Sequence, residues 1–428
     1  MKFNKICVLG LGYIGLPTAS TFATHGIKVV GVDTNPNIVE TLKNGQLHLH
    51  EPGLRTLVQA ALRSGNLTIS QEPESADAFI IAVPTPFNDN KDADLGFVKA
   101  AAKMIASVLQ KGNLVILEST SPPRTTIDVV APILEQSGLI AGGDFHLAYS
   151  PERVLPGQIL RELIENARVI GGFDPLSSEA GRDLYSIFVR GDIILTDATS
   201  AEMVKLMENT YRDVNIAVAN EFSRLAEHFG IDVWEAINIA NRHPRVNILN
   251  PGPGVGGHCI SVDPWFLASA APDITPLIQT ARGVNDSQPE FVVARVKQIL
   301  GENLSHKTIS VLGLTYKPDV DDMRESPAIE VVRSLQKEKA TVVAYEPFKE
   351  KTIPQDIQFA ESLDEALEDS DLLLLLVAHS KFKSLNPQKI AGKIGVKKVL
   401  DTVNLWDSAA WQKAGFAFFK LGVGRTLN

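Results

Sequence analysis

The segment from Pro251 to Ile260, PGPGVGGHCI, carries four glycines in ten residues and a cysteine near its end. Cys259 is one of only two cysteines in the 428 residues of the chain. One interpretation is structural: the glycines form a turn, and the thiol is a small hydrophobic side chain. The other is chemical: the glycines let a ligand approach the backbone closely, and the thiol is there to react with it. The segment by itself leaves both interpretations open.

A second group of chemically capable residues lies in a long helical pattern. Lys205, Asn209 and Arg212 are spaced i, i+4 and i+7, which places them on one face of a helix. Such a stripe is often only a solvent-exposed face. The apolar neighbours Leu206 and Met207 favour a buried helix instead. A lysine held there could exchange protons near neutral pH.

A glycine pattern near the N-terminus predicts a dinucleotide site. Gly10, Gly12 and Gly15 form GxGxxG between the apolar run KICVL and a helical pattern, and the next apolar run ends at Asp33. Gly10 permits the tight turn, Gly12 lets the backbone approach a pyrophosphate, and Gly15 lets the helix pack against the strand. The phosphates would bind at the helix N-terminus. Asp33 would accept hydrogen bonds from the adenine ribose and repel a 2′-phosphate, so NAD is predicted rather than NADP.

The elements that must position these residues begin with a doubly wound α/β domain, expected to reach to about Asp197. Near-continuous apolar runs alternate with amphipathic segments, as expected for parallel strands buried on both faces. The runs are KICVLG, KVVGVD, AFIIAVP, NLVILEST and FHLAYSPE. Thr85 and Thr120 follow two of them, at the carboxyl edge where an open α/β sheet binds ligands.

The middle of the chain predicts helices. From Ser200 to about Gly230 one long helical period contains no internal glycine or proline. It is apolar on more than one side, which is typical of a helix between domains or at a dimer interface.

The α/β rhythm restarts at Lys307 with KTISVLG. The second domain reads Gly313-Leu-Thr-Tyr-Lys317 where a dinucleotide fingerprint would stand, and a lysine there suits a phosphate better than a second dinucleotide. We therefore expect three domains, residues 1–198, 199–300 and 301–428, with the ligand site in a cleft between the two α/β domains.

Bulk properties exclude several classes of protein. The net charge of −9 argues against nucleic acid as the main partner, and two cysteines exclude a disulfide framework and favour the reducing cytoplasm. The longest aliphatic run, Leu372 to Val377, is too short to span a membrane. His48, His50 and His258 have no metal-ligand spacing, so no metal site is expected.

An NAD site combined with a thiol indicates aldehyde chemistry. A thiolate can add to an aldehyde, and the thiohemiacetal then loses a hydride to NAD, which leaves a thioester for water to hydrolyse. The glycines before Cys259 would then be needed because substrate carbon, nicotinamide and sulfur must come almost into contact. Cys7, inside the first apolar run, is expected to be a buried hydrophobic residue instead.

The combined motifs resemble the UDP-glucose/GDP-mannose dehydrogenase family. The resemblance covers nearly the whole chain, through GLGYIGLP, VPTP, EST, SPERVLPG, MVKLMENTYRDVNIAVANE, PGPGVGGHC and GLTYKPDVDDMRESP in the family's order. It implies two Rossmann-like α/β domains, binding NAD and UDP, joined by a helical middle domain that forms a homodimer. It also implies oxidation of a sugar-nucleotide primary alcohol to the acid, with two NAD and one water.

The resemblance further implies roles for individual residues. The catalytic residues would be Cys259 as nucleophile, Lys205 as acid and base, Asn209 and Asp263 beside the oxyanion and the activating water, and Glu152 and Thr120 as residues that orient water. The NAD site would be lined by Gly10, Gly12, Tyr13, Ile14, Gly15, Asp33, Thr85 and Thr120, with Arg324 on the phosphates. The substrate would contact Arg153, Val154, Lys205, Asn209, Arg212, Gly256, Tyr316, Lys317 and Arg425. Arg245, with His243 beside it, would reach the substrate phosphates of a neighbouring subunit.

Two departures from the glucose-acting branch bear on the sugar. His258 and Val262 stand where that branch has a serine and a lysine. The motifs resemble the N-acetylated branch, with UDP-N-acetyl-D-mannosamine as the expected substrate, UDP-N-acetylglucosamine as the alternative and UDP-glucose third.

Two other classes of protein share part of this pattern. A two-electron hydroxyacid-type dehydrogenase would need neither Cys259 nor a second α/β domain, and a non-catalytic binding module would form no NADH.

Overall fold

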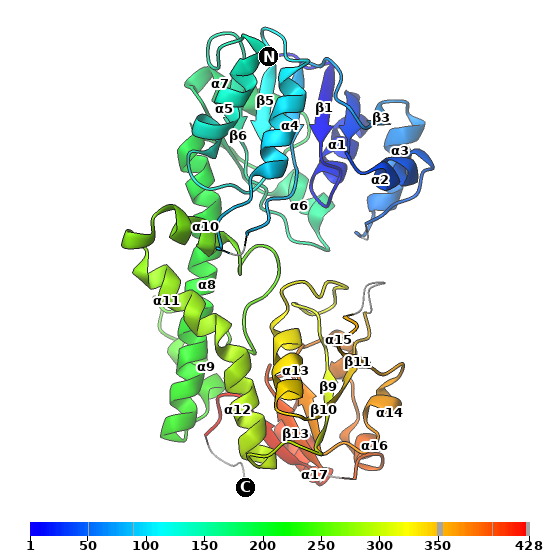
Figure 1. The fold of residues 1–428 in the computed structure, drawn as a ribbon, viewed down its shortest axis with the longest axis vertical. Helices are drawn as coiled ribbons and strands as arrows, with labels where there is room; N and C mark the ends of the chain where they lie inside the picture. The colour runs from blue at the N-terminus through cyan, green and yellow to red at the C-terminus, as the bar shows by residue number, and fades with distance from the viewer. Residues whose placement is uncertain (50, 89, 349–353, 396, 425–428) are drawn as a thin grey trace. The chain divides into compact units, whose positions relative to one another are not determined.

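The computed structural model describes residues 1–49, 51–88, 90–348, 354–395 and 397–424. The chain forms two compact units, Met1–Glu208 and Asn209–Asn428, and each is described by itself (Figure 1). The finer division into domains 1–198, 199–300 and 301–428 stays a prediction. Among the described residues, no helix has both the length and the hydropathy needed to cross a membrane.

The first unit contains an eight-stranded sheet in the order β3-β2-β1-β4-β5-β6-β7-β8. Its strands are β1 Lys5–Leu9, β2 Lys28–Val32, β3 Leu67–Ser70, β4 Ala78–Ile81, β5 Leu114–Leu117, β6 His146–Tyr149, β7 Arg168–Gly172 and β8 Ile193–Asp197. Neighbouring strands are parallel, except that β7 runs antiparallel to β6. The five apolar runs of the sequence are β1, β2, β4, β5 and β6, which confirms the predicted α/β fold.

Helices cover both faces of this sheet because alternate strand residues enter two different apolar cores. Ile6 and Val8 of β1 pack into one core with α1, α2, α3, α6 and α7, whereas Cys7 and Leu9 pack into the other with α4, α5 and the start of α8. These helices are α1 Gly15–Thr24, α2 Pro36–Lys43, α3 Leu54–Arg63, α4 Gly96–Ala106, α5 Ala131–Leu134, α6 Ile159–Glu165, α7 Pro175–Tyr185 and α8 Ala198–Phe229, and the π-helical segment Thr126–Val130 leads into α5. Cys7 is fully buried as predicted, and burial raises the pKa of its thiol to about 12.

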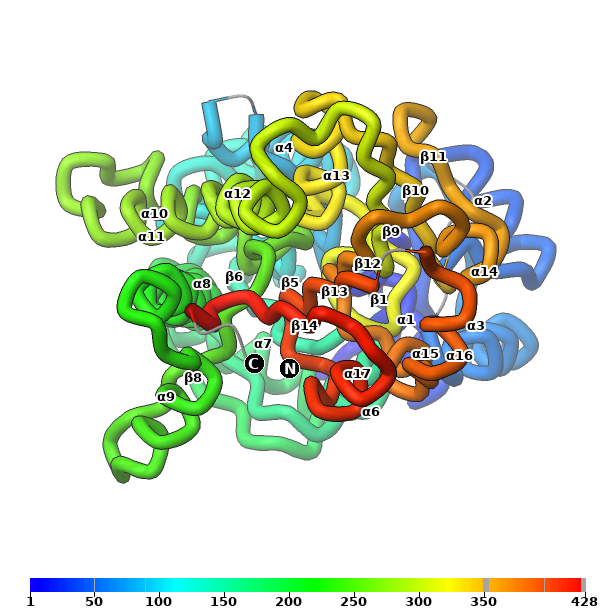
Figure 2. The backbone as a smooth tube through the Cα atoms, turned by 90° about the horizontal axis from the view of Figure 1, so that it is seen from below, coloured from blue at the N-terminus to red at the C-terminus, as the bar shows by residue number. Residues whose placement is uncertain are grey.

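The long helix expected from Ser200 to about Gly230 is α8, which continues from the first unit into the second. The helices that follow are α9 Val233–Ala240, α10 Asp263–Ala270, α11 Pro276–Asp286 and α12 Gln288–Leu300. Figures 1 and 2 both show α12 beside α13, which packs with it against the second sheet.

The second sheet has six parallel strands in the order β11-β10-β9-β12-β13-β14. Its strands are β9 Thr308–Leu312, β10 Thr341–Tyr345, β11 Gln358–Phe359, β12 Leu372–Leu375, β13 Lys398–Asp401 and β14 Ala417–Lys420, and the helices around it are α13 Pro327–Lys337, α14 Leu363–Ala366, α15 Ser380–Lys383, α16 Pro387–Ala391 and α17 Ser408–Lys413. The C-terminal strand β14 lies beside β13 at the sheet edge (Figure 2). Both sheets therefore present a carboxyl edge at which a βα turn can bind a ligand.

Candidate active site

The glycine turn after β1 has the geometry of a dinucleotide site. Gly10 has a φ of +93°, and a Cβ at this position would lie 2.4 Å from the carbonyl oxygen of Ala82. A Cβ on Gly15 would lie 1.8 Å from the carbonyl oxygen of Gly10, so the helix can begin this close to the turn only with glycine. A Cβ on Gly12 would meet nothing within 4 Å. This open space is what a pyrophosphate approaching the backbone needs, and the turn therefore fits NAD.

Asp33 is fixed beside this turn at the end of β2. Its Oδ2 accepts a hydrogen bond from the Leu11 N–H at 3.0 Å, and its Oδ1 accepts one from the Asn35 N–H at 2.9 Å. The residue is only half-buried, so the carboxylate can also accept hydrogen bonds from ribose hydroxyls. The remaining residues of the predicted NAD site in this unit are also half-buried, and they follow the neighbouring strands β1, β4 and β5. They are Tyr13, Ile14, Thr85 and Thr120.

Glu152, in the segment after β6, is held at both carboxylate oxygens. Its Oε1 accepts hydrogen bonds from the backbone N–H groups of Arg153 and Val154, at 2.7 and 3.0 Å. Its Oε2 lies 3.4 Å from a guanidinium nitrogen of Arg168, which also donates from Nε to the Ser150 hydroxyl at 2.9 Å. Sequence reasoning missed Arg168, because nothing in its local pattern links it to Glu152.

Arg168 belongs to a buried cluster at the end of β5. Its guanidinium donates to Oε1 of Glu118 at 2.5 Å and lies over the ring of Tyr185, 3.9 Å from the centroid. The Tyr185 hydroxyl donates to the same Glu118 oxygen at 2.5 Å. Burial raises the pKa of Glu118 to about 7, although the nearby Arg168 charge opposes this shift. Glu118 and Glu152 therefore share the buried guanidinium of Arg168.

The predicted residues on α8 differ in their surroundings. Lys205 and Asn209 are each only 7% exposed, whereas Arg212 is exposed, so the three do not form one buried stripe. Arg153, expected to contact substrate, forms an ion pair with Glu208 of α8, with its Nε 3.1 Å from Oε2.

In the second unit, Asn209 and Asp263 are in direct contact. The Asn209 amide donates to Oδ2 of Asp263 at 2.6 Å, and both side chains are buried. Asp263 is the first residue of α10, and its N–H donates to the carbonyl of Cys259 at 2.8 Å. Cys259 is exposed, unlike Cys7. The thiol is thus presented just before a helix whose first carboxylate is held by α8.

The glycines before Cys259 have a packing reason in addition to the substrate approach expected from the sequence. Gly257 has a φ of +86°, and a Cβ there would lie 2.7 Å from the ring of Tyr316. A Cβ on Gly256 would lie 2.3 Å from the carbonyl oxygen of Glu325. These two glycines let the cysteine loop pack against the segment that follows β9, so close packing inside the protein requires them. Gly252, by contrast, would place a Cβ in open space.

The other predicted substrate and cofactor residues of this unit are spread over several segments. Arg324 is exposed and pairs with Asp322, its Nε 2.9 Å from Oδ1, and His258 lies 3.5 Å from the other Asp322 oxygen. These contacts hold the pKa of Asp322 well below its usual range, against the effect of burial. Tyr316 and Lys317 are half-buried, and His243 and Arg245 are exposed after α9. Arg425 lies outside the described residues.

Comparisons with known proteins agree with the motifs. Three successive segments match the UDP-glucose/GDP-mannose dehydrogenase family: its NAD binding domain over residues 4–189, its central domain over 199–287 and its UDP binding domain over 310–408. The NAD binding match establishes the cofactor that the glycine turn predicted.

Similar proteins extend over almost the whole chain. An NDP-N-acetyl-D-galactosaminuronic acid dehydrogenase of Ralstonia nicotianae is 49% identical over 420 residues, covering 95% of this chain and 97% of that protein. A UDP-N-acetyl-D-mannosamine dehydrogenase of Methanocaldococcus jannaschii is 48% identical over 428 residues, covering 99% and 97%. The solved structure of a UDP-D-ManNAc dehydrogenase from Pyrococcus horikoshii has a TM-score of 0.92 at 41% identity, covering 98% of this chain and 99% of that one. The chain therefore belongs to the UDP-glucose/GDP-mannose dehydrogenase family and is an NAD-dependent UDP-sugar dehydrogenase.

Proposed function

We propose that this enzyme oxidises the C6 hydroxyl of UDP-N-acetyl-D-mannosamine to the carboxylate, which gives UDP-N-acetyl-D-mannosaminuronate. The sugar is supported by the similar proteins from Methanocaldococcus jannaschii and Pyrococcus horikoshii, both of which are named for N-acetylmannosamine. The Ralstonia nicotianae protein is named for N-acetyl-galactosaminuronic acid, which supports the N-acetylated class and a second candidate sugar within it.

In the proposed mechanism, the glycine turn and Asp33 would hold NAD, which would supply the hydride acceptor for each of the two oxidations at C6. Lys205 takes the hydroxyl proton as the alcohol becomes an aldehyde. The sulfur of Cys259 then bonds to the aldehyde carbon while the thiol proton passes to the carbonyl oxygen. Asn209, whose amide is held by Asp263, donates its other amide N–H to the charge that develops on this oxygen.

Hydrolysis completes the reaction. After the second oxidation C6 is joined to Cys259 as a thioester. Glu152 and Thr120 orient a water molecule, whose oxygen bonds to C6 while the bond from C6 to sulfur breaks. One proton of the water passes to the leaving sulfur, which restores the thiol, and the other is released as the acid ionises to the carboxylate. Glu152 suits this role because both its oxygens are already fixed by donors.

The single observation that carries this proposal is the placement of Cys259. Its thiol is exposed at the end of a loop, and the following helix begins with Asp263 hydrogen bonded to Asn209. A cysteine that served only as a hydrophobic residue would be buried, as Cys7 is.

We also propose that the enzyme is a homodimer in which Arg245 reaches the neighbouring subunit's substrate. Support comes from α8, whose surface exposes large apolar side chains at helical spacing. They are Met203, Met207, Tyr211, Val218, Phe222, Leu225 and Phe229. A row of this kind is typical of a helix that packs against another chain.

The substrate is tested by measuring NADH formation with four UDP-sugars: UDP-N-acetylmannosamine, UDP-N-acetylgalactosamine, UDP-N-acetylglucosamine and UDP-glucose. We expect the highest kcat/KM with UDP-N-acetylmannosamine. A higher value with UDP-N-acetylgalactosamine would establish the second candidate sugar, and a preference for UDP-glucose would refute the N-acetylated class.

A further inference from the structure

The turn after β9 repeats the hydrogen bonds of the NAD turn in the other unit. Gly313 has a φ of +87°, and its N–H donates to the Tyr345 carbonyl at 3.0 Å. The Leu314 N–H donates to Oε2 of Glu346 at 2.7 Å, and the Phe348 N–H donates to Oε1 at 2.8 Å. Glu346 thus takes the place at the end of β10 that Asp33 takes at the end of β2. The sequence did not reveal this, because no second glycine of the fingerprint follows Gly313.

The two acids differ in what remains accessible. Asp33 is half-buried, whereas Glu346 is only 1% exposed. His379, which is fully buried just before α15, has its Nε2 3.1 Å from Oε2 of Glu346. With backbone donors on both oxygens and an imidazole over one of them, Glu346 is not placed to recognise a ribose. It anchors His379 instead.

His379 in turn anchors the segment that follows the turn. Its Nδ1 accepts a hydrogen bond from the Asp319 N–H at 2.9 Å, so the ring proton is on Nε2, facing Glu346. Asp319 has a φ of +59°, an uncommon conformation for a residue with a side chain, and its Oδ1 accepts hydrogen bonds from the Ser380 N–H and hydroxyl at 2.9 and 3.0 Å. The Thr315 hydroxyl, 3.2 Å from Nε2, donates to the Lys317 carbonyl at 2.9 Å.

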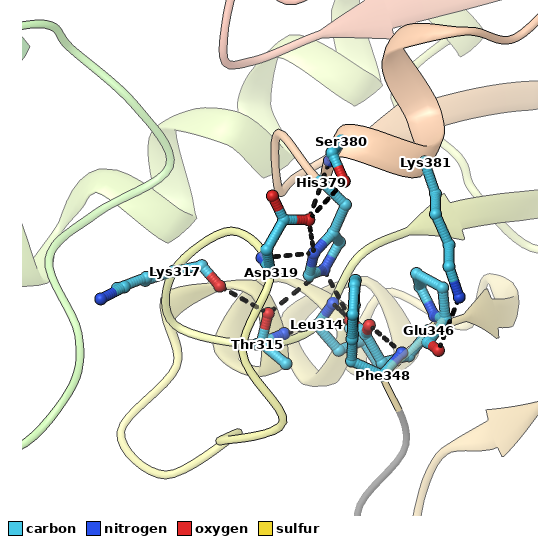
Figure 3. A network of polar contacts seen from close by, with 10 residues as sticks. Leu314, Thr315, Lys317, Asp319, Glu346, Phe348, His379, Ser380 and Lys381 are labelled. Atoms are coloured by element: carbon cyan, nitrogen blue, oxygen red, sulfur yellow. Dashed lines mark hydrogen bonds and ion pairs between the residues drawn. The ribbon is translucent and has the colours of Figure 1, made fainter. Parts of the chain in front are cut away.

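Figure 3 shows the result of these contacts. The backbone from Thr315 to Asp319 is held against His379, and the side chain of Lys317 extends away from the buried network. Such anchoring is needed here because the segment is not followed at once by a helix. In the first unit α1 begins at Gly15, directly after the turn, whereas in the second unit α13 begins only at Pro327.

The anchored segment also supports the cysteine loop. The ring of Tyr316 lies where a Cβ on Gly257 would be, and the Glu325 carbonyl lies where a Cβ on Gly256 would be. A shift of the segment would therefore move the loop that ends in Cys259, because the Tyr316 ring lies 2.7 Å from the position of a Cβ on Gly257.

We propose that His379 is a positioning residue for the UDP half of the substrate: through Nδ1 it fixes the Thr315–Asp319 segment, and with it Lys317, at the carboxyl edge of the second sheet. This inference rests on the proposed function, since it takes the ligand of this edge to be a UDP-sugar. A purely structural role is the competing explanation, because the His379 ring also packs against Phe348 and Phe382, with centroids 5.1 and 5.4 Å away.

Two substitutions separate these roles. His379→Asn places an amide oxygen near the position of Nδ1 and retains the acceptor for Asp319. His379→Gln places its amide near the position of Nε2 and loses that acceptor. Both substitutions remove the ring, so a role in packing alone predicts that they change UDP binding equally. Ser384→Ala, which removes only an exposed hydroxyl just after α15 and outside this network, is the matched control.

The readouts are the dissociation constant of UDP, measured by calorimetry, and that of NAD. We expect His379→Gln to weaken UDP binding about tenfold and to raise the KM for the UDP-sugar similarly, the effect of one lost buried hydrogen bond. We expect His379→Asn and Ser384→Ala to stay within about threefold of the parent, and NAD binding to be unchanged in all three variants. Equal losses in the Asn and Gln variants, or unaltered UDP binding in a folded Gln variant, would overturn the proposal.

A further variant decides the matter if neither His379 variant folds. Asp319→Gly retains the backbone conformation and removes the side-chain contacts to Ser380, and it should weaken UDP binding several-fold. Unchanged UDP binding in that variant would refute the inference. Failure of the parent enzyme to bind UDP at all would instead refute the proposed function, so the two failures are distinguishable.

Discussion

The carboxylate of Glu152 owes its position to a residue remote in sequence. Backbone N–H groups hold one of its oxygens, and Arg168 of β7 approaches the other. Arg168 is itself fixed by Glu118 and by the face of the Tyr185 ring. A base that must aim a water molecule at C6 gains from such fixation, because small displacements of catalytic groups cost large factors in rate.

Replacing Arg168 should therefore lower kcat more than it raises KM. We expect Arg168→Met to reduce kcat about 100-fold, and Arg168→Lys to reduce it less because a positive charge remains near Glu152. Steady-state kinetics with the UDP-sugar varied provides the measurement. Arg182→Met, at an exposed arginine on α7, is the control and should leave kcat within about twofold of the parent. A normal kcat in Arg168→Met would show that the cluster only stabilises the fold.

The sequence offers candidate reactive residues, but it does not offer the groups that hold them. Cys259, Lys205 and Asp263 belong to motifs that can be read locally. Arg168 and His379 cannot be read in this way, because their partners lie on other strands and in other loops, and only the fold brings them together.

At the scale of elements, α8 reaches across to fix the start of another helix. Glu202 of α8 accepts hydrogen bonds from the N–H groups of Arg124 and Thr126, at 2.5 and 2.7 Å, at the beginning of the π-helical segment. Burial raises the pKa of Glu202 from 4.5 to about 7 in spite of these donors. A carboxyl whose pKa rises on folding contributes stability that is fully present below pH 4.5 and is lost as the pH rises through 7.

Glu202→Gln should remove this pH dependence. Between pH 5 and pH 8 the free energy of unfolding of the variant should rise relative to the parent by roughly 2–3 kcal/mol. Urea unfolding at both pH values measures it, with Glu179→Gln, an exposed position on α7, as the control. If the free energy of unfolding changed equally between pH 5 and pH 8 in the parent and in Glu202→Gln, Glu202 would titrate as an ordinary exposed carboxyl.

The glycines of the cysteine loop give a second prediction at this scale. Gly257→Ala places a Cβ at a positive φ and 2.7 Å from the Tyr316 ring. We expect the strain alone to lower the free energy of unfolding by about 1–2 kcal/mol. We also expect kcat/KM to fall by at least about tenfold, because the loop carries Cys259. Gly252→Ala, in the same loop but with open space for a Cβ, should be nearly neutral. Thermal unfolding and kcat/KM of both variants provide the comparison. Similar losses in both would indicate that the loop requires flexibility rather than close contact.

Strands with a continuous apolar run were predictable, whereas the internal strand β7 and the edge strand β8 were not. The runs that became β1, β4 and β5 are almost entirely buried, which gives the continuous apolar pattern. β8 is mostly exposed or half-buried. β7 ends in two glycines, because a Cβ on Gly171 would lie 2.3 Å from the Asp197 carbonyl. Such strands depend on neighbours that a local pattern does not contain.

At the scale of the whole molecule, the proposed dimer would make each active site depend on two chains. Phe222 lies on the exposed apolar row of α8, and Phe222→Glu should convert a dimer into monomers in analytical ultracentrifugation. The same variant should lose activity because Arg245 could no longer reach its neighbour. Leu277→Glu, at an exposed position on α11, is the control and should leave the mass unchanged. A monomeric parent enzyme with full activity would refute the shared site.

The central claim is that Cys259 forms a covalent bond with C6 between the two oxidations. The most direct measurement counts NADH formed per UDP-N-acetylmannosamine consumed, alongside mass spectrometry of the sugar product. The parent should give two NADH and the uronic acid, and Cys259→Ser, which replaces sulfur by oxygen, should give no net formation of the acid. One NADH per substrate in the parent, or full conversion to the acid by Cys259→Ser, would contradict the account.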